Sequence, residues 1–125
     1  MLKYTHTDKA PAAVGPYSQG VSVNGMLFIS GQVGINPALG ALEGSTTVQQ
    51  AEQACKNVGE ILREAGLGFE DVVKTTCFLA DIGDFTAFNE IYAKYFTSKP
   101  ARSCVAVKDL PKGALCEIEV IAAEK

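Results

Sequence analysis

The long helical periodicity in the middle of the chain restricts the possible folds more than any other feature. Between residues 47 and 65, apolar side chains recur at alternating spacings of three and four positions, at Val48, Ala51, Cys55, Val58, Leu62 and Ala65. Residues at these spacings share one face of an α-helix. Thr46 and Gln49 have the spacing of a capping box, and Gly66 follows as a helix-ending residue. The pattern predicts a helix over residues 47–65 whose apolar face, Cys55 included, packs on a second layer.

Strand signals on both sides of this helix supply the second layer. Asn24-Gly25 stands between the apolar runs at residues 18–23 and 26–33. This pair predicts a β-hairpin, because both of its residues tolerate the positive φ of a tight turn. The other expected strands are a short one near the N-terminus and those at residues 72–80, 100–107 and 115–123.

A second helix is expected after the strand at residues 72–80. Asp84 is placed to cap it and Pro100 to limit it, and its aromatic residues have helical spacing: Phe85, Phe88, Tyr92, Tyr95 and Phe96. An aromatic stripe of this kind is more typical of a core than of a cofactor site. The chain is therefore predicted to be one domain, residues 1–125, with an α+β fold in which two helices pack on one face of a mixed β-sheet.

The expected sheet carries apolar residues on both faces. If the helices cover one face, the other should be polar, yet Phe28, Cys104 and Ala106 fall on the side expected to be open. In the last strand, Ile121 also shares the parity of the glutamates. This pattern indicates that identical subunits bury the second face. An exposed, partly apolar sheet face is the alternative.

Charge and hydropathy exclude several functions. The chain has a net charge of −3, whereas proteins that bind nucleic-acid backbones are usually basic. Its longest apolar run, residues 26–29, is too short to cross a membrane, and the N-terminus has neither a signal core nor an Arg-rich transit pattern. We expect a cytoplasmic protein without a nucleic-acid or membrane partner.

The content of histidine and cysteine limits the chemistry. The single histidine, His6, lies near the N-terminus and is a poor candidate for a zinc site or a catalytic triad, so no metal site is expected. The four cysteines form no CxxC pair, and without a secretory signal they are expected to be reduced thiols. Catalysis would then depend on carboxylates, arginine, tyrosine, serine, cysteine or backbone groups.

Arg102 is the first candidate functional residue. Of the two arginines, Arg63 lies on a polar helix flank, whereas Arg102 lies in an apolar strand, where an unpaired guanidinium is costly to bury. Its planar fork matches a carboxylate with two parallel hydrogen bonds. That carboxylate can belong to the protein itself or to a ligand, and the pattern alone favours neither.

Strand alternation suggests companions for this arginine. Arg102 and Cys104 share one face of their strand, and a glutamate of the next strand, Glu117 or Glu119, can share that face. One carboxylate beyond the one that neutralises the arginine could hold a water molecule or accept a proton. Gly31, in Ser30-Gly31-Gln32, either lets a ligand approach backbone N–H groups or serves a turn.

These residues, together with longer segments, resemble the RidA/YjgF family of reactive-intermediate deaminases. The resemblance runs through nearly the whole chain, and its most specific stretch begins at Pro100 and ends at Glu119. The matching segments are residues 10–20, 30–32, 71–76, 88–92, 100–105, 110–114 and 117–119. The resemblance implies a chorismate-mutase-like α+β subunit and a homotrimer. In that trimer the sheets form a central barrel, the helices lie outside, and a cleft lies between each pair of subunits.

The resemblance also implies a reaction. It is the hydrolysis, without a cofactor, of 2-imino acids or their enamine tautomers to 2-oxo acids and ammonia, with 2-aminoacrylate, 2-iminopropanoate and 2-iminobutanoate as substrates. By the same resemblance, Arg102 anchors the substrate carboxylate, and Glu117 orients and activates the attacking water. We assign Glu119 a structural role. The remaining site residues implied are Tyr17, Ser30, Gly31, Asn89 and Cys104, the last mainly through its backbone.

Two other functions compete with hydrolysis. A trimeric protein could use the same Arg102 to bind a 2-oxo acid or a similar small carboxylate, as a binding or regulatory protein without turnover. Some family members are instead described as RNA-cleaving or translation-inhibiting proteins. The acidic charge and the lack of a basic aromatic patch argue against an RNA-directed role here.

Overall fold

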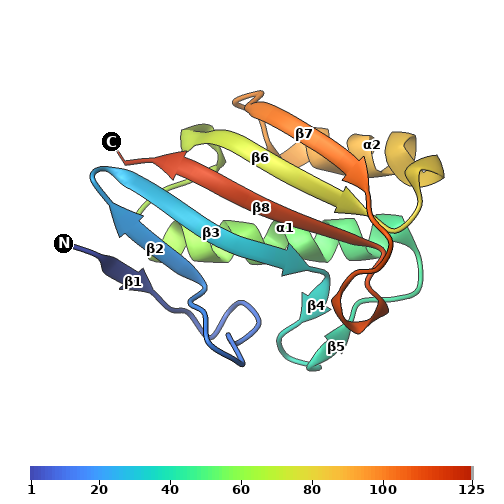
Figure 1. The fold of residues 1–125 in the computed structure, drawn as a ribbon, viewed down its shortest axis with the longest axis horizontal. Helices are drawn as coiled ribbons and strands as arrows, with labels where there is room; N and C mark the ends of the chain where they lie inside the picture. Colours follow the sequence, from blue (N-terminus) through green and yellow to red (C-terminus); the bar gives the residue numbers. More distant parts are fainter. Residues whose placement is uncertain (125) are drawn as a thin grey trace.

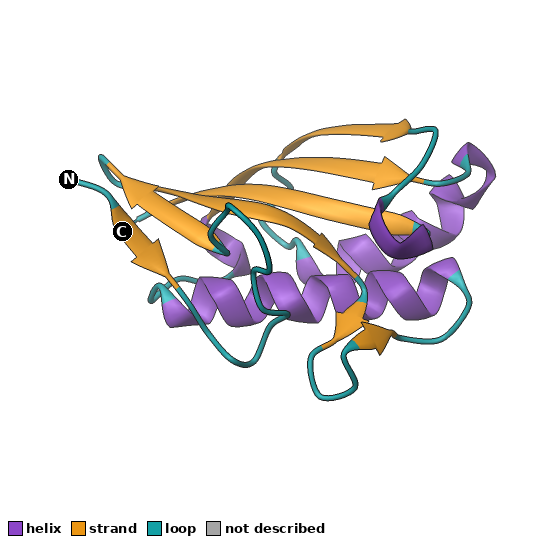
Figure 2. Ribbon diagram, turned by 60° about the horizontal axis from the view of Figure 1, so that its bottom comes forward, coloured by secondary structure: helices purple, strands orange, loops and turns teal. Residues whose placement is uncertain are grey.

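The computed structural model describes residues 1–124 and consists of two α-helices on one face of a six-stranded sheet (Figure 1). In sheet order the strands are β1 (Lys3–Thr5), β2 (Gly20–Val23), β3 (Met26–Val33), β8 (Cys116–Ala123), β6 (Val72–Leu79) and β7 (Ala101–Ala106). Only β6 and β7 pair in parallel; the other neighbours are antiparallel. The helices are α1 (Thr47–Glu64) and α2 (Phe85–Tyr95), and Figure 2 shows both on the same side of the sheet. The predicted mixed α+β fold is confirmed.

Local sequence signals set the bounds of most elements. The turn between β2 and β3 has positive φ at Asn24 and Gly25, as the hairpin prediction requires. Thr46 and Gln49 form the predicted capping box of α1, and Gly66 follows the helix with φ of 80°. The sequence did not indicate a small separate ladder of β4 (Ile35–Asn36) and β5 (Ala41–Leu42), nor the 3₁₀ turns at Phe69–Asp71, Ile82–Asp84 and Pro111–Gly113.

The first turn of α1 differs from its predicted orientation. Val48, expected in the buried stripe, is 44% exposed, whereas Thr47 and Gln50 are buried. The Thr47 hydroxyl donates to the Asp84 carboxylate (2.7 Å), and the Gln50 side chain accepts from the backbone N–H of Leu115 (2.8 Å). These hydrogen bonds hold the polar side chains inward and leave Val48 facing outward.

The start of α2 also differs in part. Asp84 stands at the N-cap, but its side chain makes no capping hydrogen bond, since it accepts from Thr47 of α1 instead. The predicted aromatic core is confirmed for Phe88, Tyr92 and Phe96, which are buried. Phe85 keeps 36% of its surface exposed.

The sheet face opposite the helices is partly apolar, as predicted. Phe28, Val73 and Val105 are each more than 40% exposed on that face. The assignment of Cys104 and Ala106 to it was wrong. In the β6–β7 register these two residues pair with Cys77 and Leu79, which belong to the core beneath the helices. Side chains of directly paired residues point to the same face, so Cys104 and Ala106 point toward the helices.

Candidate functional site

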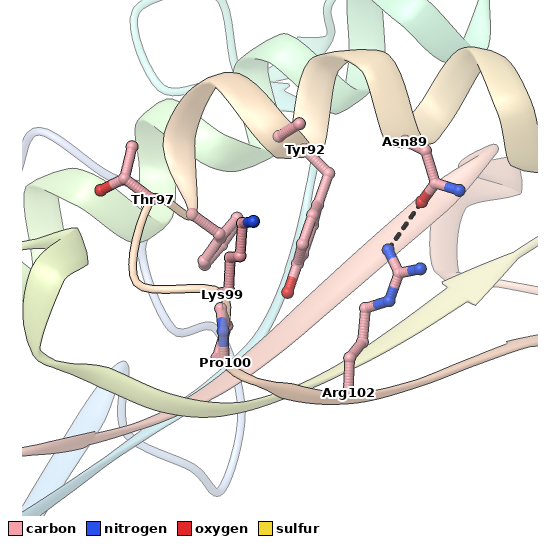
Figure 3. Close-up of a pocket in the computed structure, with 8 residues that line it drawn as sticks. Asn89, Tyr92, Thr97, Lys99, Pro100 and Arg102 are labelled. Carbon is pink, nitrogen blue, oxygen red and sulfur yellow. Dashed lines mark hydrogen bonds between the residues drawn. The ribbon is translucent and has the colours of Figure 1, made fainter.

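Arg102, near the start of the edge strand β7, directs its side chain toward α2 (Figure 3). Its Nη1 donates to the Oδ1 of Asn89 at 2.7 Å. The guanidinium carbon lies 4.7 Å from the ring centre of Tyr92 and 5.5 Å from that of Phe85, both within cation–π range. Within residues 1–124 the guanidinium makes no ion pair with a carboxylate. Because no carboxylate of residues 1–124 neutralises the guanidinium, its charge is available to a ligand anion.

The pocket beside Arg102 is large enough for a small metabolite. It has a volume of about 550 Å³ and lies between α2 and the chain that leads into β7. Figure 3 shows Lys99 and Arg102 among its lining residues, and the part of the chain that the structure describes contributes no acidic side chain to it. Phe96 and Pro100 supply apolar surface. This combination of positive charge and apolar walls suits a small organic anion.

Ser30 and Gly31 form a β-bulge rather than a turn. In the β3–β8 pairing, Ile29 lies opposite Val120 and Gln32 opposite Ile118, so two residues of β3 face one residue of β8. Bulges redirect side chains and are frequent beside active sites. The Ser30 hydroxyl donates to the carbonyl of Ser18 at 2.6 Å.

Gly31 is required by the position of Glu117. A Cβ at Gly31 would overlap the Glu117 carboxylate, so the absence of a side chain makes room for that group. Glu117 is half-buried, and its pKa is raised above the ordinary value, first by burial and second by the charge of Glu119. A carboxyl group with a raised pKa keeps its proton to a higher pH than an ordinary glutamate, which favours a role in proton transfer.

Arg102 and Glu117 lie on opposite faces of the sheet, which corrects the prediction that a glutamate shares a face with Arg102 and Cys104. Arg102 pairs with Thr75 of β6, whereas Glu117 pairs with Phe78. These β6 residues are three positions apart, and strand side chains alternate, so the two groups point in opposite directions. Glu119 has the same parity as Glu117 and also faces away from the helices.

The predicted site residues therefore form two groups in one chain. Asn89 and Cys104 accompany Arg102 on the helix side. Tyr17, which is 53% exposed, lines a small cavity together with Gly31, close to Ser30 and Glu117. Burial raises the pKa of the Cys104 thiol, so the reactive thiolate is disfavoured there.

The sequence reasoning missed the part played by the α2 aromatics. Phe85 and Tyr92 had been assigned to the core, yet both rings lie against the Arg102 guanidinium. Phe85, Asn89 and Tyr92 are spaced by four and three residues, which places them on one face of α2. That spacing shows in the sequence that the three side chains share a face. Predicting that this face contacts Arg102 also requires knowing that α2 packs against β7.

Within residues 1–124, no group of three or more His, Cys, Asp or Glu side chains is arranged to hold a metal ion. Over the same residues, neither helix combines the length and the apolar character needed to cross a bilayer. The four cysteines are all free thiols.

Two helices on one face of a mixed sheet, with an arginine pocket at the sheet edge, define a small α+β protein with a candidate anion site. A model of the family described as Endoribonuclease L-PSP matches residues 7–124, and the chain belongs to this family, the RidA/YjgF family.

Relatives carry several names. A Mus musculus protein named 2-iminobutanoate/2-iminopropanoate deaminase is 53% identical, covering 98% of this chain and 91% of its own. A Lactococcus lactis protein named as a regulator, AldR, is 52% identical over 99% of both chains. The crystal structure of E. coli TdcF with bound serine has a TM-score of 0.93 at 40% identity, covering 98% of this chain and 99% of its own.

Proposed function

We propose that this protein is a deaminase that hydrolyses 2-imino acids and their enamine tautomers to 2-oxo acids and ammonia. The observation that carries the proposal is the Arg102 guanidinium, which no carboxylate of the described chain neutralises and which faces a pocket without acidic residues. A relative of the same family at 53% identity is named 2-iminobutanoate/2-iminopropanoate deaminase. Another relative, TdcF, was crystallised with serine, which also carries a carboxylate beside a C–N bond.

Arg102 would anchor the substrate by its carboxylate. A 2-imino acid carries that carboxylate directly on the reacting carbon, so holding it with two parallel hydrogen bonds fixes the C=N group in one place. Asn89 holds one edge of the guanidinium at 2.7 Å and limits its rotation. Cys104 lies next along the same face and would contribute backbone contacts rather than a nucleophile.

A second copy of the chain would complete the site, which supports an oligomer with sites between subunits, such as the homotrimer that the family resemblance implies. Glu117 and Arg102 of one chain point to opposite sides of its sheet, whereas β7 is an edge strand that a neighbour can approach. The exposed apolar residues of the open face, Phe28 and Val105 among them, favour burial against other copies. Glu117, Gly31, Ser30 and Tyr17 of one copy would then meet Arg102 of the next.

The proposed reaction needs an imine held in a fixed position and a group that carries protons. Water held by Glu117 adds to C2 of the protonated imine, and the carboxylate accepts a proton from it, which gives a carbinolamine. Glu117 returns this proton to the nitrogen, and the C–N bond breaks as the hydroxyl proton passes to the Glu117 carboxylate. Glu117 gives that proton to the departing ammonia, which leaves as ammonium, and the 2-oxo acid remains. Proton transfer by a positioned group contributes roughly 10²–10⁴ in rate.

A coupled assay tests this function directly. Purified protein is mixed with 2-aminoacrylate or 2-iminobutanoate generated in situ, and release of the 2-oxo acid is followed. We expect faster release than the spontaneous hydrolysis of the same imine. A rate equal to the spontaneous one would contradict the enzyme function.

A binding role without turnover is the second candidate, and the relative named as the regulator AldR favours it. It predicts saturable binding of 2-oxobutanoate that depends on Arg102, with no acceleration of imine hydrolysis. The family description also names an endoribonuclease. The net charge of −3 opposes that activity, and salt-dependent binding of RNA by nuclease-free protein would revive it.

Glu119 is expected to contribute to the pH at which activity is lost on acidification, because its charge raises the pKa of Glu117. Because the pKa of Glu117 is raised, its carboxylate form, and with it kcat/KM, is lost at a higher pH than for an ordinary glutamate. The variant Glu119→Gln removes the second cause of that shift, so the acid limb of the kcat/KM profile should move to lower pH. Burial, the larger cause, remains and should keep the limb above that of an ordinary glutamate. An unmoved limb would show that Glu117 is not the titrating group.

Gly31→Ala is expected to lower kcat/KM by about 10–100-fold, because the new methyl group displaces the Glu117 carboxylate. The backbone at Gly31 does not have positive φ, so the fold should tolerate alanine. Thermal unfolding and the oligomer mass are measured beside the rate. Full activity in a folded Gly31→Ala protein would separate Glu117 from the reaction.

A further inference from the structure

Side chains from α2 form a cradle around the Arg102 guanidinium. Phe85, Asn89 and Tyr92 lie on the face of α2 that meets β7, and Figure 3 shows Asn89 and Tyr92 near the guanidinium. Asn89 accepts from one edge of the fork at 2.7 Å, while the Tyr92 ring lies 4.7 Å from the guanidinium carbon. An edge contact and a ring contact together restrict both the direction and the plane of the fork.

Tyr92 itself is held at both ends. Its hydroxyl lies 2.7 Å from the Oγ1 of Thr75, which is fully buried on β6. Its ring stacks on Phe96, with centroids 4.4 Å apart and planes 19° apart. Thr75 is also the direct β6 partner of Arg102 in the strand register. The ring is therefore fixed by the same strand pair that fixes the Arg102 backbone.

A core aromatic residue would not need these polar contacts. Burying the hydroxyls of Tyr92 and Thr75 is favourable only while they satisfy each other, and phenylalanine would fill the same space without that requirement. Tyr95, on the same helix, offers a comparison: its ring packs 5.6 Å from that of Phe69, and the rings in cation–π contact with Arg102 are those of Phe85 and Tyr92. The Tyr92–Thr75 pair differs from Tyr95 because the ring of Tyr92 contacts the Arg102 guanidinium.

We propose that Tyr92, locked by Thr75, is a positioning residue that sets the plane of the Arg102 guanidinium for the substrate carboxylate. This inference rests on the proposed function of Arg102 as a carboxylate anchor. A two-point hydrogen bond needs the fork and the carboxylate in one plane, so a fork that is already oriented binds more tightly than a free one. Tyr92 touches neither substrate nor water in this proposal and acts only through Arg102.

The test compares matched variants of the two tyrosines. Tyr92→Leu should raise KM for 2-iminobutanoate and the Kd of 2-oxobutanoate by about 5–30-fold, the range of a desolvated cation–π contact, with little change in kcat. Tyr92→Phe, which keeps the ring but loses its hydrogen bond to Thr75, should recover only part of the loss. Thr75→Ser, which keeps the hydroxyl, should bind like the unsubstituted protein, whereas Thr75→Val should not. Tyr95→Leu is the control and should leave KM and Kd unchanged.

Repeating Tyr92→Leu in a protein that already carries Arg102→Lys separates an effect on the orientation of the guanidinium from a general effect on the fold. In Arg102→Lys, the ammonium has no plane to be set, so adding Tyr92→Leu should change the Kd of 2-oxobutanoate by at most about twofold. An equal penalty in both backgrounds, or an equal penalty from Tyr95→Leu, would overturn the inference. Because the Kd is measured without turnover, a protein that binds 2-oxobutanoate but hydrolyses no imine would contradict the proposed deaminase function and still test the cradle.

Discussion

Arg102→Ala is expected to lower kcat/KM for 2-iminobutanoate by about 10²–10³-fold, because the substrate carboxylate loses its half-buried charged partner. Within the described residues no other carboxylate shares this guanidinium, so its removal leaves no orphaned internal acid. The fold should therefore persist, and the loss should appear in binding of the 2-oxo acid as well as in hydrolysis. Steady-state kinetics and calorimetric titration with 2-oxobutanoate measure the two effects.

The chain offers a matched control for this substitution. Arg63, the only other arginine in the sequence, is exposed in the last turn of α1. Arg63→Ala removes the same charge from the molecule as a whole and should leave kcat/KM within about twofold, since exposed charges act weakly at a distance. If both variants lose activity equally, long-range charge rather than a carboxylate anchor is responsible. If neither does, Arg102 is not the anchor.

Helices and turns that depend on residues close together in the chain could be predicted from the sequence. The capping residues Thr46 and Gln49 and the apolar stripe that follows are sufficient to place α1, and Asn24-Gly25 is sufficient to place the hairpin. The predicted burial of Val48 was wrong because the periodic pattern assigns the first helical turn the same buried face as the rest of the helix. Its burial was decided by hydrogen bonds that Thr47 and Gln50 make to residues distant in the sequence.

The relative placement of the site residues could not be predicted, because it depends on strand register. Which face Arg102 occupies relative to Glu117 follows from their partners on β6, Thr75 and Phe78, and a shift of one residue would reverse it. The bulge at Ser30 and Gly31 likewise exists only in the pairing of β3 with β8. Residue types identified the candidates, while their geometry required the tertiary structure.

The separation of Arg102 and Glu117 leads to the second large effect, an expected complementation between two inactive variants. Glu117→Gln alone should lower kcat by about 10²–10⁴, the contribution of a positioned proton carrier, while the oligomer persists. Arg102→Ala alone is expected to lose most of its activity for a different reason, because it lacks the carboxylate anchor. Co-expressing the two, or refolding them together, should restore about a quarter of the unsubstituted activity. If each site takes its arginine from one copy and its glutamate from the next, each group is intact with a probability of about one half.

Refolding the unsubstituted chain together with the double variant Arg102→Ala/Glu117→Gln, so that subunits assort at random, distinguishes sites shared between copies from sites within one chain. Sites shared between copies need two unsubstituted neighbours, so an equal mixture should retain about a quarter of the activity. Sites contained within one chain would retain about half in this mixture and would give no recovery when the two single variants are combined. Opposite faces of one sheet cannot present both groups to a small imino acid, since strand side chains alternate and the sheet stands between them. We therefore expect about a quarter of the unsubstituted activity in both mixtures. About half of the activity with the double variant, together with no recovery from the two single variants, would place the water-activating group on the same chain as Arg102.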